Sequence, residues 1–143
     1  MGLREEHLRM GAWFFKKAKE LYKSVDTADN EDDVYGWYML SSESLLLSFD
    51  HAIKAFIAKY YPEMLEIGRL ERIDLLFTNE IVIMLNDYEI DALNIVYKIL
   101  ETRNRIVYLS KETYLTDVRE KGLNELNKQI KEAKYAINII TRL

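Results

Sequence analysis

Proline is nearly absent from this chain of 143 residues, which contains one proline and five glycines. Tight turns and β-bulges depend on these two residue types, so a chain that lacks them has few places at which to reverse direction. The single proline, Pro62, ends one predicted helix and suits the first turn of the next. The sequence therefore predicts a few long helices joined by short connections.

Apolar residues recur at three- and four-residue steps through several segments, which is the spacing of one helix face. The predicted helices span residues 3–25, 34–61, 88–109 and 116–143, with one or two short helices between 63 and 88. Thr113 or Thr116 is expected to cap the last of them. The acidic segment 26–33 and the segment 109–115 are expected to be irregular, and the first of these an exposed loop.

Each long helix has its own apolar pattern. The stripe of the first is Met10, Phe14, Ala18, Leu21 and Val25, widened by Trp13, Phe15 and Tyr22. The second carries two stripes, which predicts neighbours on both sides, and its small serines, Ser41, Ser42, Ser44 and Ser48, permit close helix approach. The seam of the fourth is Ile90, Leu93, Tyr97, Leu100, Asn104 and Val107, and that of the last is Leu126, Ile130, Ala133, Ile137 and Ile140.

No strand-like alternation and no internal repeat interrupts these patterns, and the length suits one domain. We therefore predict a single all-α domain over residues 1–143, an antiparallel bundle of four to six helices with a four-helix up-and-down core.

Composition excludes several classes of site and of protein. The chain has no cysteine, and so no disulfide, thiol nucleophile or cysteine-ligated metal. No run approaches the roughly 20 apolar residues of a membrane helix, and no apolar stretch follows the charged start, so we expect a soluble, cytoplasmic protein without a membrane partner. His7 and His51 are the two histidines; the charged context of His7 predicts a surface role, and His51 lacks further ligands at helical spacing, so we expect no metal and no cofactor.

The formal net charge of −4 is unevenly distributed. Basic residues exceed acidic ones in residues 1–25 and 98–143, whereas residues 26–97 are strongly acidic. The basic ends can bind RNA if the fold brings them together, although scattered solvated charges explain the same pattern.

The most unusual stretch, residues 101–110, places polar side chains inside an apolar helical pattern. Asn104 and Tyr108 are four residues apart and share a face. Arg103 and Tyr108 lie about 140° apart on an ideal helix, so they meet if the helix ends or bends there, or if a second subunit completes the site. The structural alternative is that Arg103 pairs with a carboxylate such as Asp50 while Asn104 satisfies a neighbouring helix end.

These residues resemble the HEPN domain family, small antiparallel helical bundles marked by Arg, a polar residue that is often Asn, three further residues and His. Here the motif reads R-N-R-I-V-Y from Arg103 to Tyr108. The second helix reads DHAIKA, with Asp50, His51 and Lys54 at the acid and the two lysines of the family's E-K-A-L-K-A pattern. The opening helix, with Trp13, Phe14 and Ala18, also resembles the family's, so the resemblance covers most of the chain.

The resemblance implies a homodimer whose arginine motifs face a shared cleft, and active HEPN proteins are metal-independent ribonucleases. This sequence departs from the family at the decisive place, since Tyr108 stands where the histidine would be. Tyrosine, with an unperturbed pKa near 10, is a poor base at neutral pH. His51 can substitute if it points into the cleft. Some HEPN toxins also carry a partner-modified tyrosine two residues after the histidine, where this chain has Ser110.

Four hypotheses follow. The first, which we favour, is a HEPN-like dimeric module that binds RNA or a nucleotide without catalysis. The second is an active metal-independent ribonuclease or toxin. The third is a toxin–antitoxin type protein that partners a minimal nucleotidyltransferase, and the fourth a purely structural bundle. The candidate ligand-binding residues are Arg103, Asn104, Tyr108, Asp50, His51 and Lys54, and the candidate catalytic residues are Arg103 and Tyr108.

Overall fold

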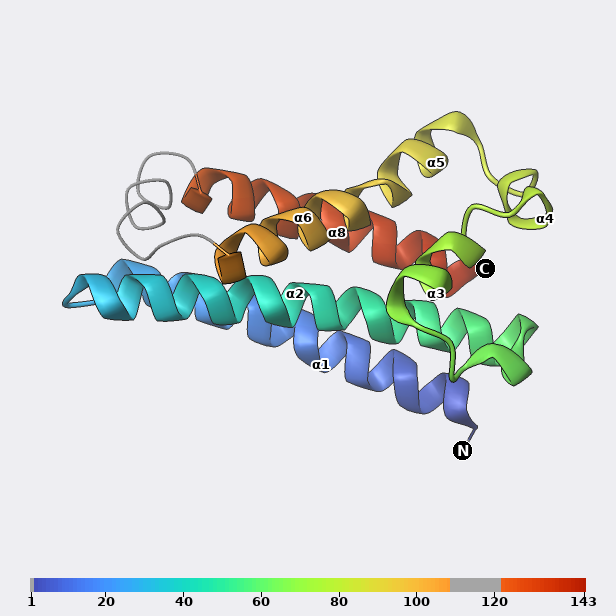
Figure 1. Cartoon of the computed structure of the whole chain (residues 1–143), viewed down its shortest axis with the longest axis horizontal. Coiled ribbons are helices and arrows are strands. Elements are labelled where there is room, and N and C mark those ends of the chain that lie inside the picture. The colour runs from blue at the N-terminus through green and yellow to red at the C-terminus, as the bar shows by residue number, and fades with distance from the viewer. Residues whose placement is uncertain (1, 109–121) are drawn as a thin grey trace.

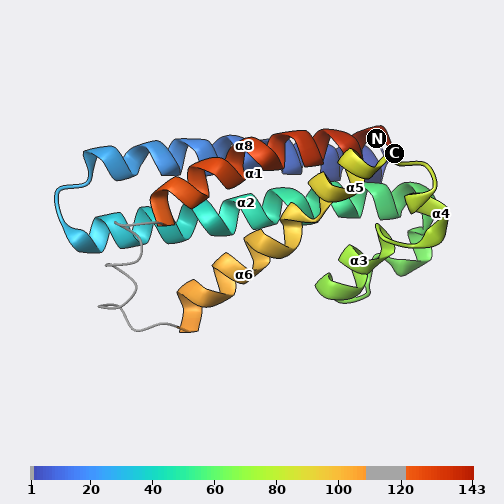
Figure 2. The same ribbon diagram turned by 90° about the horizontal axis from the view of Figure 1, so that it is seen from above.

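The computed structural model describes residues 2–108 and 122–143. These residues form helices and no strand, which confirms the predicted all-α bundle. The elements are α1 (Leu3–Ser24), η1 (Val25–Thr27), α2 (Glu31–Tyr60), η2 (Pro62–Met64), α3 (Arg69–Leu75), α4 (Asn79–Val82), α5 (Asp87–Leu93), α6 (Ile95–Tyr108) and α8 (Leu123–Arg142). The four long helices α1, α2, α6 and α8 alternate in direction, and both termini lie at the same end (Figure 1). Seen from above, α6 runs obliquely to the others (Figure 2).

The central helix is α2, which packs against α1, α6 and α8 and contacts α3. Its two predicted apolar stripes are buried apart from Met39, which is partly buried, and Tyr60, which is 40% exposed, as expected for a helix with neighbours on opposite sides. The stripes are Tyr38, Leu45, Phe49, Ala52, Phe56 and Tyr60 on one face and Met39, Leu46, Ile53 and Ile57 on the other. Its most deeply buried large side chains are Tyr38, Leu45, Leu46, Phe49, Ile53 and Ile57. This burial fixes α2 as the scaffold on which the candidate polar residues are placed.

The α1–α2 contact is close because small residues line it, as the serine pattern predicts. Ser41 Oγ donates to the Ala18 carbonyl at 2.7 Å, and Ser48 Oγ donates to the Gly11 carbonyl at 2.8 Å. A Cβ added at Gly11 would lie 3.3 Å from the Ser48 carbonyl oxygen, closer than most such contacts. The two backbones are therefore held together by buried hydroxyls rather than by large side chains.

The apolar surface of α1 is only partly covered. Ala18 and Val25 are buried as predicted, and Gly11, which the stripe did not include, is buried with them. Met10 and Trp13, in contrast, are 39% and 50% exposed. The helix faces α2 along its small residues, so part of the predicted stripe is turned toward solvent.

The predicted exposed loop over residues 26–33 is wrong in its second half. The helix α2 begins at Glu31, because Asn30 caps it by accepting from the Asp33 amide at 2.9 Å. Three acidic residues follow in the first turn, where carboxylates interact favourably with the positive end of the helix dipole.

The predicted helix over 88–109 is also wrong, because it is two helices that break at Asn94. The Asn94 side chain donates to the Ile90 carbonyl at 3.2 Å, a local bond that competes with the helical ladder. The break shifts the core face of α6 to Ile95, Val96 and Ile99, and leaves Tyr97 36% exposed.

The helix α8 buries the predicted stripe, with Leu126, Ile130, Ala133 and Ile140 in the core and Ile137 packed against it. The predicted caps Thr113 and Thr116, together with Ser110, lie outside the described residues. Of the helices described, none is both long and apolar enough to cross a membrane.

Candidate functional site

The α2 carboxylate Asp50 is 5% exposed and lies against the short helix α3. Arg72 of α3 donates to it three times, from Nε to Oδ1 at 3.2 Å and from one terminal nitrogen to Oδ1 and Oδ2 at 2.9 and 3.2 Å. This side chain is itself 11% exposed and also donates to the Ile67 carbonyl. The pair is thus a buried, charge-assisted contact in which each ion compensates the other.

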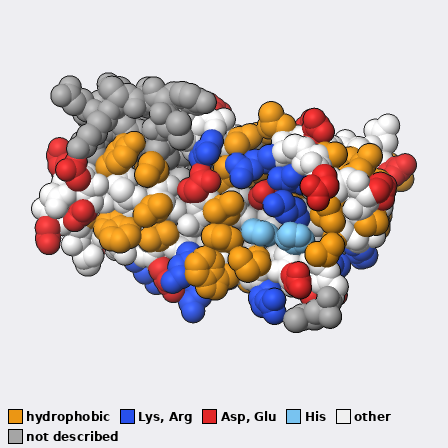
Figure 3. Space-filling view, turned by 60° about the horizontal axis from the view of Figure 1, so that its bottom comes forward, with side chains coloured by type: hydrophobic (Ala, Val, Ile, Leu, Met, Phe, Trp, Pro, Cys, Tyr) orange, Lys and Arg blue, Asp and Glu red, His pale blue; other side chains and the backbone are white. Residues whose placement is uncertain are grey.

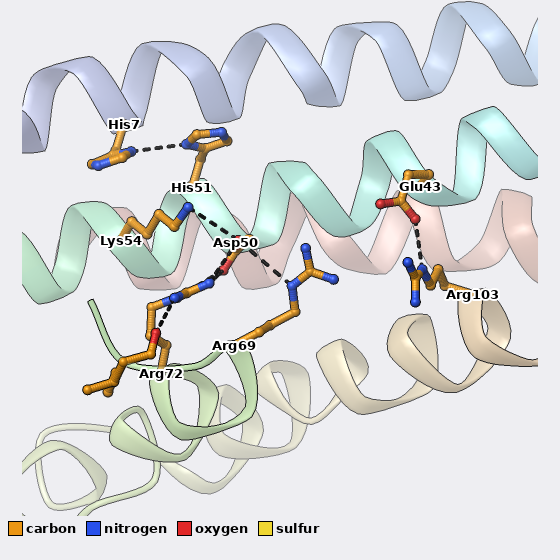
Figure 4. A network of polar contacts seen from close by, with 9 residues as sticks. His7, Glu43, Asp50, His51, Lys54, Arg69, Arg72 and Arg103 are labelled. Carbon is orange, nitrogen blue, oxygen red and sulfur yellow. Dashed lines mark hydrogen bonds and ion pairs between the residues drawn. The ribbon is translucent and has the colours of Figure 1, made fainter. Parts of the chain in front are cut away.

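Two more cations face the same carboxylate. Lys54 Nζ lies 3.6 Å and Arg69 Nε 3.8 Å from Asp50 Oδ2, both beyond hydrogen-bond distance. Their side chains are 28% and 30% exposed, and neither donates a hydrogen bond to any residue in the described part of the chain. Since Arg72 already neutralises Asp50, Lys54 and Arg69 are surplus positive charges with unused donors (Figure 4).

The two histidines form a pair beside this cluster. The Nδ1 atoms of His7 on α1 and His51 on α2 are 3.0 Å apart, and the His51 ring stacks on Phe14 with an interplanar angle of 7°. The two rings lie side by side at the surface, between cationic and hydrophobic side chains (Figure 3). We call the following group of side chains the α2–α3 cluster: the His7–His51 pair, Asp50, Lys54, Arg69 and Arg72.

Burial lowers the pKa of both imidazoles, and the positive charge of Lys54 lowers it further. Arg72 acts in the same direction, whereas Asp50 opposes it at both rings and Glu6 opposes it at His7. The lowered pKa values favour the neutral rings, and a hydrogen bond between two neutral rings at this distance requires one ring to donate its Nδ1 proton to the Nδ1 lone pair of the other.

Arg103 of α6 lies apart from this cluster. Its Nε donates to Glu43 of α2 at 2.9 Å, and a terminal nitrogen donates to the Asn104 side-chain oxygen at 3.2 Å. The Arg103 and Glu43 side chains are each about one-third exposed. Asp50 is thus not the partner of Arg103, as the structural alternative had suggested; a carboxylate two turns earlier on α2 fills that role.

The distance between the two groups follows from helix geometry. Glu43 and Asp50 are seven residues apart on one side of α2, which is two turns or about 10 Å. Figure 4 shows Arg103 and the α2–α3 cluster side by side along this helix, with His51 turned toward α1. His51 therefore does not point into the neighbourhood of Arg103.

Tyr108 is the last described residue of α6, and its side chain lies outside the described residues. The helix continues from Arg103 to Tyr108, so the two positions stay about 140° apart around it. Within one chain these two positions would meet if the helix ended or bent between them, and the helix does not end there.

Four residues of these groups were not predicted from the sequence, namely His7, Glu43, Arg69 and Arg72. The charged context of His7 predicts only a surface role, and the sequence does not indicate that the two histidines of the chain meet. Arg69 and Arg72 lie at i and i+3 in an otherwise acidic region, and this spacing indicates a basic helix face. The spacing does not indicate which carboxylate that face contacts.

No three potential metal ligands gather anywhere among the described residues. No protein-family model, curated protein or solved structure matches this chain. The resemblance to HEPN domains stays a prediction.

Proposed function

We propose that this chain is a HEPN-like module that binds RNA or a nucleotide through its phosphates, without cleaving it. The observation that carries the proposal is the charge surplus at Asp50, where three cations surround one carboxylate and only Arg72 donates hydrogen bonds to it, so that Lys54 and Arg69 keep unused donors. Lysine and arginine with free N–H groups are the side chains that bind phosphate oxygens.

Arg103 extends the proposed surface along α2. It is one-third exposed and, within the described part of the chain, pairs with one carboxylate, Glu43, so a phosphate can compete for its remaining donors. The Asn104 amide next to it offers further hydrogen-bonding groups. The two cationic points lie about 10 Å apart along the helix, a separation that an extended single strand of RNA can bridge.

The absence of catalysis is part of the proposal. Cleavage at the 2′-hydroxyl needs a proton acceptor near neutrality and a cation at the same phosphate. Tyr108 stands at the position of the family histidine, and tyrosine, with an unperturbed pKa near 10, is a poor proton acceptor at neutral pH. Histidine is the side chain whose unperturbed pKa lies nearest neutrality, and both imidazoles lie with Lys54 rather than with Arg103.

The test is fluorescence anisotropy with a labelled single-stranded RNA, comparing wild type with Lys54→Gln, Arg69→Gln and Arg103→Gln. Each loss of a phosphate contact is expected to weaken binding several-fold and to reduce the salt slope by about one. The matched control is Lys128→Gln, which removes the same charge from a side chain 78% exposed on α8. Failure of wild type to bind, or equal weakening in all four variants, overturns the proposal.

The alternative is a metal-independent ribonuclease or toxin, and the His7–His51 pair is the observation that favours it. Wild type, Arg103→Ala, Tyr108→His and His51→Gln are incubated with a mixed RNA pool without metal. Under the proposal wild type leaves RNA intact, and activity gained by Tyr108→His would mean an intact site that lacks its proton acceptor. Cleavage by wild type that vanishes in Arg103→Ala or His51→Gln would establish the ribonuclease instead.

The homodimer is also part of the proposal, supported by the exposed apolar side chains of α1, Met10 and Trp13. A second copy can supply the Tyr108 position that α6 keeps away from Arg103 within one chain. Partnership with a minimal nucleotidyltransferase stays a prediction, tested by co-purification with such an enzyme encoded beside this chain.

A further inference from the structure

The His7–His51 pair is the feature of the structure that the proposed surface leaves unexplained. A distance of 3.0 Å between two Nδ1 atoms leaves room for one proton between them. The ring that donates this proton has a bare Nε2, whereas the ring that accepts it carries its own proton on Nε2. The pair therefore offers one hydrogen-bond donor and one proton acceptor at its two remaining nitrogens.

The charges around the pair favour an anion over a metal cation. The groups that act on both imidazoles are Lys54, Arg72 and Asp50, to which Glu6 is added at His7 and His7 itself at His51. Arg72 and Asp50 compensate each other by direct hydrogen bonds, and Glu6 is exposed to solvent on α1. Lys54, which acts on both rings, and Arg69, which lies with it against Asp50 Oδ2, remain as two positive charges, and they would repel a divalent cation.

Two surplus charges match a ligand that carries two negative charges. A phosphodiester carries one charge and no proton that titrates near neutrality. A phosphate monoester carries nearly two, and its second pKa of about 6 lies in the range of imidazole. A monoester can therefore meet both cations and exchange its proton with the bare Nε2 of the pair.

We propose that His7, His51, Lys54 and Arg69 form a binding site for a phosphate monoester, such as the terminal phosphate of a nucleotide or of an RNA strand. The inference rests on the proposed function, because that function is the reason to assign the phosphate to a nucleotide or an RNA strand. The inference adds that the α2–α3 cluster selects a phosphate monoester. The internal phosphates of a bound strand then follow α2 toward Arg103.

The test uses the two histidine ring signals of the full chain, observed by proton–carbon NMR and assigned with His7→Gln and His51→Gln. Adenosine 5′-monophosphate is expected to shift both signals and to raise both imidazole pKa values, because the bound anion stabilises the protonated rings. Adenosine, which lacks the phosphate, leaves them unchanged. Absence of a shift with the monophosphate overturns the inference.

A second arm compares two RNA strands of one sequence with a 5′-phosphate or a 5′-hydroxyl end. Wild type and Lys128→Gln are expected to bind the phosphorylated strand about tenfold more tightly than the 5′-hydroxyl strand, which is the gain that one charged hydrogen bond allows. Lys54→Gln and Arg69→Gln are expected to bind the two strands equally. These two side chains are partly exposed, so they carry the test even if a histidine variant fails to fold.

The outcomes separate the two proposals. Equal binding of both strands with unchanged histidine signals refutes the monoester site and leaves RNA binding in place. Histidine shifts with adenosine 5′-monophosphate, but no binding of either strand, support the monoester site and refute RNA binding.

Discussion

Asp50 shows how one buried charge organises its surroundings. A carboxylate that is 5% exposed must be compensated, and Arg72 provides this with three hydrogen bonds from α3. The contact ties a helix of seven residues, which is too short to be stable alone, to the central helix α2. The same carboxylate attracts Lys54 and Arg69, so the polar cluster depends on a residue that itself need not contact a ligand.

Replacing Asp50 with Asn is expected to lower the free energy of unfolding by about 3 kcal/mol, because Arg72 is left buried and unpaired. Urea denaturation monitored by circular dichroism measures the change. The control is Asp74→Asn, which removes an exposed carboxylate that accepts a hydrogen bond from Tyr97 and should change stability much less. Equal effects of the two substitutions would show that the buried pair contributes nothing special.

The histidine pair makes stability depend on pH. Burial and Lys54 hold both pKa values below the ordinary 6.5, so in this range the unfolded chain binds more protons than the folded chain. The stabilisation is fully present above about pH 6.5 and is lost as the pH falls through the lowered pKa values. The melting temperature should therefore fall between pH 7 and pH 5 more steeply in wild type than in the double variant His7→Gln/His51→Gln. Parallel curves would contradict this.

At the scale of the elements, the contact between α1 and α2 depends on small residues. Gly11 of α1 lies against the Ser48 carbonyl of α2, whereas an added Cβ at Gly36, inside α2, would have no atom within 4 Å. The same residue type thus has opposite roles at the two positions. At Gly11 the missing side chain permits close backbone approach, while at Gly36 it simply weakens the helix.

Gly36→Ala is expected to raise the free energy of unfolding by about 0.5–1 kcal/mol, the usual gain of helix propensity. Gly11→Val is expected to lower it by about 2 kcal/mol, since the added methyl groups separate two backbones that are joined by the Ser48 hydroxyl. Thermal denaturation of both variants measures these two changes in the free energy of unfolding. A Gly11→Val protein as stable as wild type would mean that the helices can move apart without cost.

At the scale of the whole molecule, the bundle leaves part of α1 uncovered. Trp13 is half exposed and stacks edge-on against Phe14, close to the histidine pair. An exposed tryptophan beside further apolar side chains is typical of a protein–protein contact. The proposed dimer would therefore bring a second copy near the α2–α3 cluster.

Analytical ultracentrifugation is expected to give twice the chain mass of 17.0 kDa for wild type. Trp13→Gln should shift the equilibrium toward the monomer, because it removes the largest exposed apolar side chain of α1. Ile83→Gln is the control, since Ile83 is 83% exposed at the end of α4, on another part of the surface. A wild-type monomer at every concentration, or equal dissociation of both variants, would contradict dimerisation through α1.

The sequence by itself determined the helical class, the long helices α1, α2 and α8 and most of their buried stripes. These follow from periodicity and from the scarcity of Pro and Gly, which are properties of neighbouring residues. The errors in predicted helix ends also have causes in neighbouring residues. The Asn30 side chain caps α2 and the Asn94 side chain interrupts the predicted helix over 88–109, and apolar spacing alone cannot place either helix end.

Only the tertiary structure decided which polar residues meet. Asp50, His51 and Lys54 were candidates from the sequence, but their partners Arg72 and His7 are 22 and 44 residues away from the residues they contact. Arg103 meets Glu43 rather than Asp50 because α6 crosses α2 two turns earlier. Such pairings depend on how helices cross and on which charges burial forces together, and neither is encoded in the spacing of one helix.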